Sequence, residues 1–189
     1  MTLDITCEVK DQSGFWATTE STQTPIGEAT DVILVEKRTL VLRERHVRQG
    51  PLAIDLTFTD DKVTGKIAMA KSRESKAVDV ALGGPLFADA ASALPSFAVL
   101  PLADGYKVAF RNLELQPVGP KIMQLSVVGS ESVTVPAGTF DSWKLEVFPI
   151  DKPSEKTTVW IAKAQHKAVK YTSVSQEAGP ATVTTELQP

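Results

Sequence analysis

The stretch SVTVPAGTFDSWKLEVF, residues 132–148, decides the fold. Apolar and polar side chains alternate on both sides of the Pro-Ala-Gly segment at 136–138, and this two-residue period is typical of a half-buried strand. Proline presets φ for the second position of a type I turn, and glycine adopts the left-handed conformation that follows it in a three-residue hairpin loop. The stretch therefore predicts an antiparallel hairpin whose loop closes on Val135 and Thr139.

The loop length determines which side chains share a face of this hairpin. A three-residue loop places the odd-numbered side chains of both strands on one face. We therefore expect Leu125 and Val127 near Val147, with Trp143 and Leu145 on the same apolar surface. The opposite face carries the polar residues of both strands.

The same alternation recurs along most of the chain. Residues 52–58 and 63–69 alternate around an Asp-Asp-Lys turn, which predicts a second hairpin. Other stretches with strand character lie at residues 3–8, 14–22, 32–35, 39–47, 77–82, 106–115, 121–128, 157–162, 168–175 and 181–187. About eleven strands at spacings of about ten residues favour an antiparallel sheet over a parallel α/β fold.

One segment has helical character. Pro85 and Pro95 bracket a run in which apolar residues recur every four positions. Proline is acceptable at the first helical position, and a second proline stops the run. A helix this short is not stable alone and usually packs on a sheet. We therefore expect a short helix near residues 85–94.

The length indicates a single domain. A chain of 189 residues can bury roughly 70% of its unfolded surface, which suffices for a core without metals or crosslinks. We expect one mainly β domain over residues 1–189, built on one large curved antiparallel sheet with the short helix on its concave side.

The composition argues against several classes of partner. The formal net charge of −3 and the pI near 5.5 provide no basic field for nucleic acid. No run of about 18 apolar residues predicts a transmembrane segment. Cys7 is the single cysteine, so no intrachain disulfide forms. Residues 1–14 lack the basic and apolar regions of a leader and read as a strand, so we expect that a leader or a preceding domain is missing.

No residue pattern indicates a reactive centre. His46 and His166 are the only histidines, and neither lies in a metal-ligating spacing. His46 lies among Arg43, Arg45 and Arg48, where a cation would be repelled; these arginines form a solvated face or, alternatively, meet a lipid head group or an acidic partner. Nucleophile-elbow, P-loop and dinucleotide motifs are absent from the sequence. We expect no catalytic residue, metal or cofactor.

Four short motifs in the C-terminal part carry a family resemblance: VPAGTFD at 135–141, TVWI at 158–161, VKY at 169–171 and TEL at 185–187. Together they resemble a family of bacterial envelope proteins of unknown function, which is similar in fold to the lipoprotein-carrier (LolA-like) group. The resemblance implies an open half-barrel of antiparallel strands over a helix, an apolar cavity and a periplasmic or secreted location. It brings no catalytic residues, and the signal peptide that it implies is absent from this sequence.

Five apolar residues are the candidate ligand-binding residues: Leu56, Phe58, Phe110, Trp143 and Trp160. The curved sheet offers more concave apolar surface than one short helix covers, so these side chains would line a cavity. The alternative is that they fill the core, as aromatic side chains commonly do.

Three functional hypotheses follow. The first is a non-enzymatic cell-envelope domain that binds a lipid or another hydrophobic ligand. The second is an accessory C-terminal β-domain of a larger secreted hydrolase or peptidase, covalently linked to or associated with that enzyme and without a ligand of its own. The third is a hydrolase whose site the sequence does not reveal.

Overall fold

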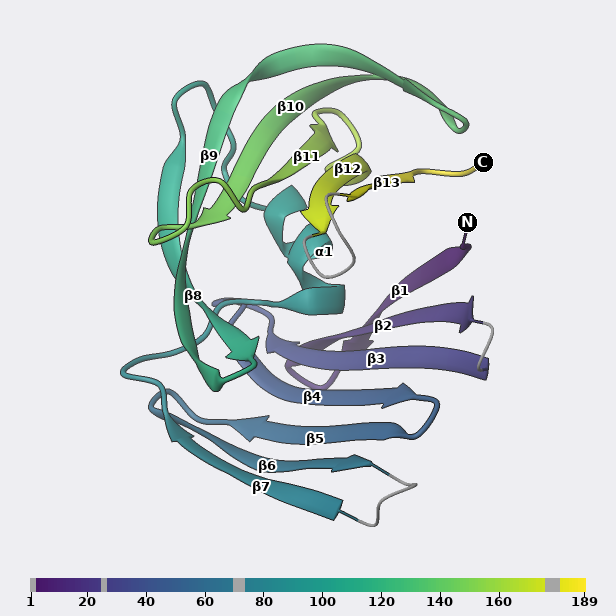
Figure 1. Ribbon diagram of the computed structural model, residues 1–189. Coiled ribbons are helices and arrows are strands. Elements are labelled where there is room, and N and C mark those ends of the chain that lie inside the picture. Colours follow the sequence, from purple (N-terminus) through teal and green to yellow (C-terminus); the bar gives the residue numbers. More distant parts are fainter. Residues whose placement is uncertain (1–2, 25–26, 70–73, 176–180) are drawn as a thin grey trace. The chain divides into compact units, whose positions relative to one another are not determined.

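The computed structural model describes residues 3–24, 27–69, 74–175 and 181–189. In these residues the chain forms thirteen strands, one 3-10 turn and one α-helix (Figure 1). The strands, in chain order, are β1 Ile5–Gln12, β2 Phe15–Thr24, β3 Gly27–Glu36, β4 Leu42–Gln49, β5 Leu52–Phe58, β6 Lys62–Met69, β7 Glu74–Ala81, β8 Lys107–Leu115, β9 Val118–Val135, β10 Gly138–Pro149, β11 Thr157–Ala162, β12 Lys167–Ser175 and β13 Ala181–Glu186.

The strands form two antiparallel sheets rather than the one large curved sheet that the sequence predicted. β1 to β7 follow chain order in a seven-stranded sheet, and β13 to β8 form a six-stranded sheet. Neither sheet is closed or strongly curled. The chain between β7 and β8 contains no strand, so the ladder stops at β7 and β8 begins a new sheet. The alternation of apolar and polar residues shows which face of the sheet each side chain occupies, but it does not show to which sheet the strand belongs.

The chain separates into two compact units. Unit 1 comprises residues 1–93 and 111–120, and unit 2 comprises residues 94–110 and 121–189. One face of the seven-stranded sheet carries the core of unit 1, and we call it the inner face. The buried core residues of unit 1 are Ile33, Val35, Leu42, Ile54, Leu56, Phe58, Val63, Val78, Leu82, Leu86, Ala88, Ala91 and Leu113.

A β-bulge in β4 changes which residues reach the inner face. Val35 pairs with Leu42, but Ile33 pairs with Arg45, so β4 contains one extra residue, Arg43. A bulge of this kind lets side chains three positions apart point to the same face. Leu42 and Arg45 therefore both face inward, while the Arg43 guanidinium forms ion pairs at 2.7 and 2.8 Å with carboxylates of the outer side.

The hairpin of β9 and β10 forms as predicted, but its loop is one residue shorter. Val135 pairs with Gly138 rather than with Thr139, because Gly138 adopts φ +133° and joins the ladder. The shorter loop places Val133 opposite Phe140, so the odd-numbered residues of the two strands do not share a face here. The expectation that they do was wrong for this half of the hairpin.

A second bulge restores the predicted register farther along the same pair of strands. Lys144 pairs with Gly129 and Leu145 with Val127, which leaves Val128 as the extra residue of β9. Beyond the bulge Leu125 lies opposite Val147, as predicted. Unit 2 therefore buries residues on both faces of its sheet: Val133, Val135, Ala162 and Val169 on one face, and Leu125, Val127, Leu145, Val147, Val159 and Ile161 on the other.

The helix lies later in the chain than predicted. A 3-10 turn, Ala90–Ser92, leads into α1, Ala93–Ala98. Asp89 caps the turn by accepting a hydrogen bond from the Ala90 N–H at 2.6 Å, and Pro95 sits in the first turn of α1, where no intrahelical N–H partner is needed. Leu86 is buried in a non-helical segment, and its carbonyl accepts a hydrogen bond from the Leu42 N–H at 2.9 Å. The four-residue spacing that includes Leu86 therefore reflects burial and not a helix.

Candidate functional site

The five predicted ligand-binding residues are divided between the two units. Leu56 and Phe58 are 0% and 3% exposed and belong to the core of unit 1. Phe110 packs its ring against Phe97 of α1 in unit 2, with ring centroids 5.9 Å apart. Leu56 and Phe58 are therefore packed in a core cluster, and ligand contact at these two positions would require that core to open.

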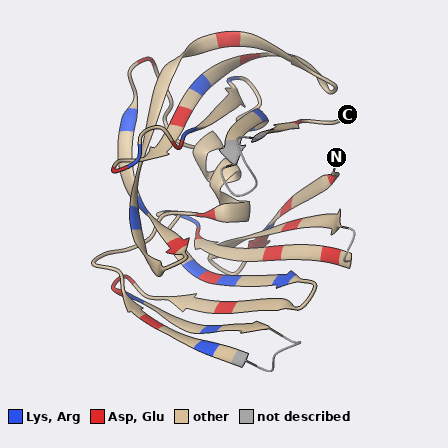
Figure 2. Cartoon of the chain, in the orientation of Figure 1, with Lys and Arg blue, Asp and Glu red and all other residues tan. Residues whose placement is uncertain are grey.

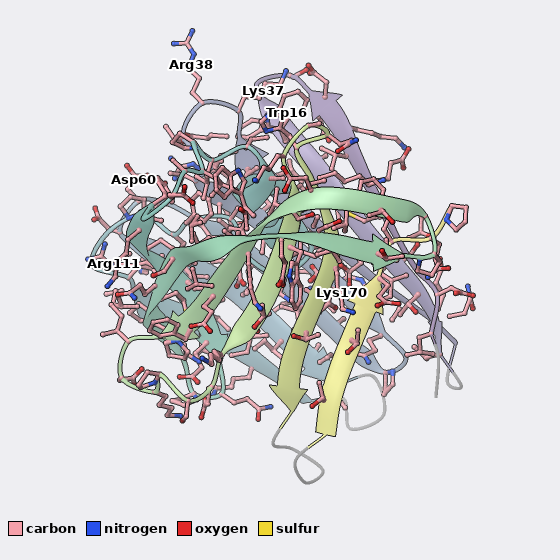
Figure 3. All side chains as sticks on the ribbon, turned by 90° about the horizontal axis from the view of Figure 1, so that it is seen from above. Trp16, Lys37, Arg38, Asp60, Arg111 and Lys170 are labelled. Carbon is pink, nitrogen blue, oxygen red and sulfur yellow. The ribbon has the colours of Figure 1, made fainter. Side chains whose placement is uncertain are left out.

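Trp160 is half-buried against the core cluster of unit 2 that contains Val133 and Val169, and charged side chains surround its ring. Its indole N–H donates to the Glu131 carboxylate at 2.6 Å, and the Nζ atoms of Lys144 and Lys170 lie 5.5 and 5.9 Å from the centroid of its ring. Lys170, labelled in Figure 3, also pairs with Glu186 at 2.7 Å. The hydrogen bond from Trp160 and the charge of Lys144 lower the pKa of Glu131. Cation–π and ionic contacts thus hold this side chain.

Trp143 occupies the opposite face of the six-stranded sheet. Trp160 pairs with Lys144, the neighbour of Trp143, and consecutive strand residues point to opposite faces. The Lys163 Nζ lies 4.4 Å from the Trp143 ring centroid and 3.1 Å from the Asp141 carboxylate. The two tryptophans therefore do not line one surface.

The register of the seven-stranded sheet divides its inner face into a buried half and an open half. Ile33, Arg45 and Leu56 are direct neighbours in one row across the sheet, and the two apolar members of this row are fully buried. In the next rows toward the β4–β5 turn Ile54 is buried, and the other apolar side chains are half-buried or exposed. Four of these, which we call the open patch, are direct or diagonal neighbours: Val47, Leu52, Ile67 and Met69.

The open patch is an extension of the core rather than a set of isolated residues. Val47 pairs with Ile54, and Ile54 pairs with Ile67. Ile54 is 4% exposed, whereas Met69 at the end of β6 is 42% exposed. Apolar surface that continues from a core into solvent is a common mark of a binding surface.

A cluster of charged side chains lies on the inner face beside the open patch. Arg45 forms a two-pronged ion pair with Asp31, through Nε to Oδ1 at 3.2 Å and Nη2 to Oδ2 at 2.8 Å. Its Nη1 lies 3.6 Å from Oδ2 of Asp89, the residue that caps the 3-10 turn. These three side chains are only 12–16% exposed. Glu20 lies directly opposite Asp31 and completes the cluster.

Burial alters the titration of two of these carboxyl groups. The pKa of Asp89 is raised, mainly because burial removes the carboxylate from water, and the opposing effects of Arg45 and of hydrogen bonds from Ala90 and Asn112 are smaller. The pKa of Glu20 is also raised, first by burial and then by the negative charge of Asp31. Arg45 is thus shared among several acidic groups beside the buried apolar residues Ile33 and Leu56.

The sequence interpretation missed this cluster. The sequence places Arg45 with Arg43 and Arg48 on one charged face, whereas the structure turns Arg45 to the inner face. A signal was present in β3, where Asp31 has the same parity as the core residues Ile33 and Val35. Figure 2 shows acidic positions in β3 beside basic positions in β4. The bulge at Arg43, which turns Arg45 inward, has no comparable signal in the sequence.

The outer face of β4 carries the two other predicted features of this region. His46 lies between carboxylates, with Nδ1 2.9 Å from Asp55 Oδ1 and Nε2 3.2 Å from Glu44 Oε2. Arg48 donates to the same Asp55 oxygen at 2.6 Å. These partners raise the pKa of His46, with the hydrogen bond to Asp55 as the largest cause. His46 is therefore surrounded by acidic groups and not, as expected, by cations alone.

Within the described ranges, no group of three or more His, Cys, Asp and Glu side chains is placed to hold a metal ion. In the same residues no helix has both the length and the apolar character to span a membrane. Every buried polar side-chain atom there has a hydrogen-bond partner. On the inner face, the open patch therefore lies beside charged side chains whose buried polar atoms all have hydrogen-bond partners.

The comparison with known families assigns the chain. The model of the DUF3108 family, described as proteins of unknown function, matches residues 2–187, so the chain belongs to this family. No curated protein sequence and no solved structure matches it. The family description specifies no activity, and the geometry of the inner face therefore carries the functional argument.

Proposed function

We propose that this chain is a non-enzymatic domain of the bacterial cell envelope that binds a lipid or another hydrophobic ligand on the inner face of its seven-stranded sheet. The open patch of Val47, Leu52, Ile67 and Met69 is the observation that carries the proposal. The sequence resemblance to the lipoprotein-carrier group, which implies an apolar cavity, points to the same class of ligand. A periplasmic or secreted location is part of the same proposal.

Apolar burial would supply the binding energy. Each Å² of ligand surface removed from water contributes about 25 cal/mol, and lost translational and rotational freedom offsets a large part of the gain. A ligand that extends along neighbouring strands covers more apolar surface than a compact one. The charged cluster of Arg45, Asp31 and Asp89 then marks where the apolar contact ends.

The ligand contacts in this proposal differ from the five residues that the sequence suggested. Leu56 and Phe58 form the buried core beside the contact surface, on the same face of the sheet. The contact itself comes from Met69, which is 42% exposed, with the half-buried Val47, Leu52 and Ile67 beside it. Phe110, Trp143 and Trp160 belong to unit 2 and have no role in it.

A fluorescent fatty acid tests the proposal. The wild-type protein should bind it saturably, and native mass spectrometry should detect the bound acid. Leu52→Glu places a carboxylate within the apolar contact and should weaken binding at least about tenfold, because burying an unpaired charge is unfavourable. Val128→Glu is the matched control, since Val128 is 50% exposed on the bulge of β9 and should leave binding unchanged. Absence of binding to the wild type, or equal binding by the Leu52→Glu variant, would refute the proposal.

The accessory-domain hypothesis remains the second candidate, because the same open patch fits the surface of an attached enzyme domain. It predicts that the patch is covered in the protein that contains that domain. Protection of the Met69 thioether from peroxide oxidation in such a protein, but not in this chain alone, would favour it over ligand binding.

A further inference from the structure

We propose that β1 pairs with β1 of a second copy of this chain, so that two seven-stranded sheets join edge to edge in a symmetric dimer. Within the part of the chain that the structure describes, β1 is the end strand of its sheet and pairs only with β2. All eight of its residues are exposed. An exposed edge strand presents unpaired backbone N–H and C=O groups, which are a template for another strand.

The side chains of β1 favour association rather than solvation. Ile5 and Val9 are 40% and 46% exposed, and they lie with Cys7 on the inner-face side, because Cys7 pairs with Glu20 of β2. The other edge strand of the sheet, β7, carries an exposed lysine, Lys76, on that side. Inward-facing charges are a common protection of free edges. On β1 the one inward charge is Asp11, which pairs with Lys37 near the end of the strand, so Ile5, Cys7 and Val9 carry no charge on that side.

Symmetry restricts how two copies of β1 can meet. An antiparallel pair with a two-fold axis perpendicular to the sheet keeps both inner faces on the same side. The axis then passes midway between the two copies of one residue, and that residue faces its own copy in the partner strand. If that residue were Thr6, Asp4 would face the partner's Glu8. If it were Glu8, two glutamates would face each other. Both registers place like charges directly opposite, which destabilises a strand pair.

The register centred on Cys7 is self-complementary. It places Ile5 opposite the partner's Val9 and Asp4 opposite the partner's Lys10, each of them twice because of the symmetry. Ile5 and Val9 then meet on the inner side, where Leu3 also faces the partner's Asp11, and opposite charges meet on the outer side. The inner faces of the two copies become continuous across the junction.

Sedimentation and light scattering over a concentration series test the dimer. The wild type should approach twice the chain mass of 20.4 kDa as its concentration rises toward about 0.1 mM, because a single strand pair gives a modest affinity. Lys10→Asp creates two Asp–Asp contacts and should raise the dimer dissociation constant about tenfold or more. The double variant Asp4→Lys/Lys10→Asp exchanges the two charges and should restore wild-type affinity.

Lys66→Asp is the control, because Lys66 is exposed on β6, which is paired on both sides by β5 and β7, and the change should leave the dimer unchanged. A short bismaleimide should link two copies through Cys7 in the wild type and much less in the Lys10→Asp variant. A monomer at every concentration would overturn the proposal. So would a dimer that Lys10→Asp does not weaken or that the double variant does not restore.

Discussion

The two faces of β4 carry similar charged groups in different surroundings. On the inner face, Arg45 and Asp31 are 12% and 16% exposed and lie beside fully buried aliphatic side chains. On the outer face, the side chains of His46 and Arg48 are 37% and 52% exposed. One strand therefore holds a buried charge cluster and a solvated one, only one residue apart.

This difference shows that the setting of an ion pair, rather than its length, determines what it contributes. The Arg48–Asp55 pair is shorter, at 2.6 Å, than the Arg45–Asp31 pair at 2.8 Å. Exposed pairs nevertheless contribute little because water and salt screen them. Removal of one partner from a buried pair leaves an uncompensated charge away from water.

Replacement of Arg45 should give the largest effect. Arg45→Met leaves Asp31 and Asp89 without their cation, so we expect the free energy of unfolding to fall by about 3–5 kcal/mol. Arg48→Met, the matched change on the outer face, should cost less than about 1 kcal/mol. Urea denaturation measures both values. Equal losses for the two variants would show that the inner cluster is as well solvated as the outer one.

Asp89→Asn should change how the free energy of unfolding depends on pH, and this change distinguishes the inner cluster from the outer one. Because the pKa of Asp89 is raised above 3.8 in the folded protein, its contribution to stability is present below that value and is lost as the pH rises through the folded-state pKa. Asparagine does not titrate and still accepts the hydrogen bond that caps the 3-10 turn. The unfolding free energy of the wild type relative to the variant should therefore fall as the pH is raised from about 4. A constant difference over this range would contradict the assignment.

His46→Gln should give a smaller effect in a different pH range. The carboxylates of Asp55 and Glu44 raise the pKa of His46 above 6.5, so the stabilisation is present below that value and is lost as the pH rises through the folded-state pKa. Relative to this variant, the wild type should lose stability between about pH 6 and pH 8. Titration of the His46 ring by NMR provides an independent check, and a pKa at or below 6.5 would contradict the described contacts.

Much of the strand structure could be predicted from the sequence, because a half-buried strand shows its two faces through alternation. The hairpin of β5 and β6 is confirmed: β5 spans the predicted residues 52–58, and β6 begins at Lys62, one residue earlier than predicted. The position of the helix could not be predicted from the spacing of apolar residues, because Leu86 is apolar as a buried core residue and not as part of a helix. The capping role of Asp89 also depends on Ser92, whose side chain accepts a hydrogen bond from the Asp89 N–H at 3.1 Å.

The candidate site was harder to predict because it depends on bulges. The extra residue Arg43 turns Arg45 to the inner face, and the extra residue Val128 reverses the faces of β9. One inserted residue exchanges every side chain beyond it between the two faces, and alternation alone does not reveal the insertion. The family match and the sequence resemblance likewise give no information about these local register changes.

The position of a bound hydrophobic ligand tests the central claim most directly. With methionine methyl groups labelled by carbon-13, Met69 reports on the open patch and Met123, in β9 of unit 2, serves as the internal reference. On titration with the fatty acid, we predict that the Met69 methyl resonance shifts saturably while that of Met123 stays in place. Saturable binding that shifts Met123 and leaves Met69 unchanged would contradict a ligand site on the inner face of the seven-stranded sheet.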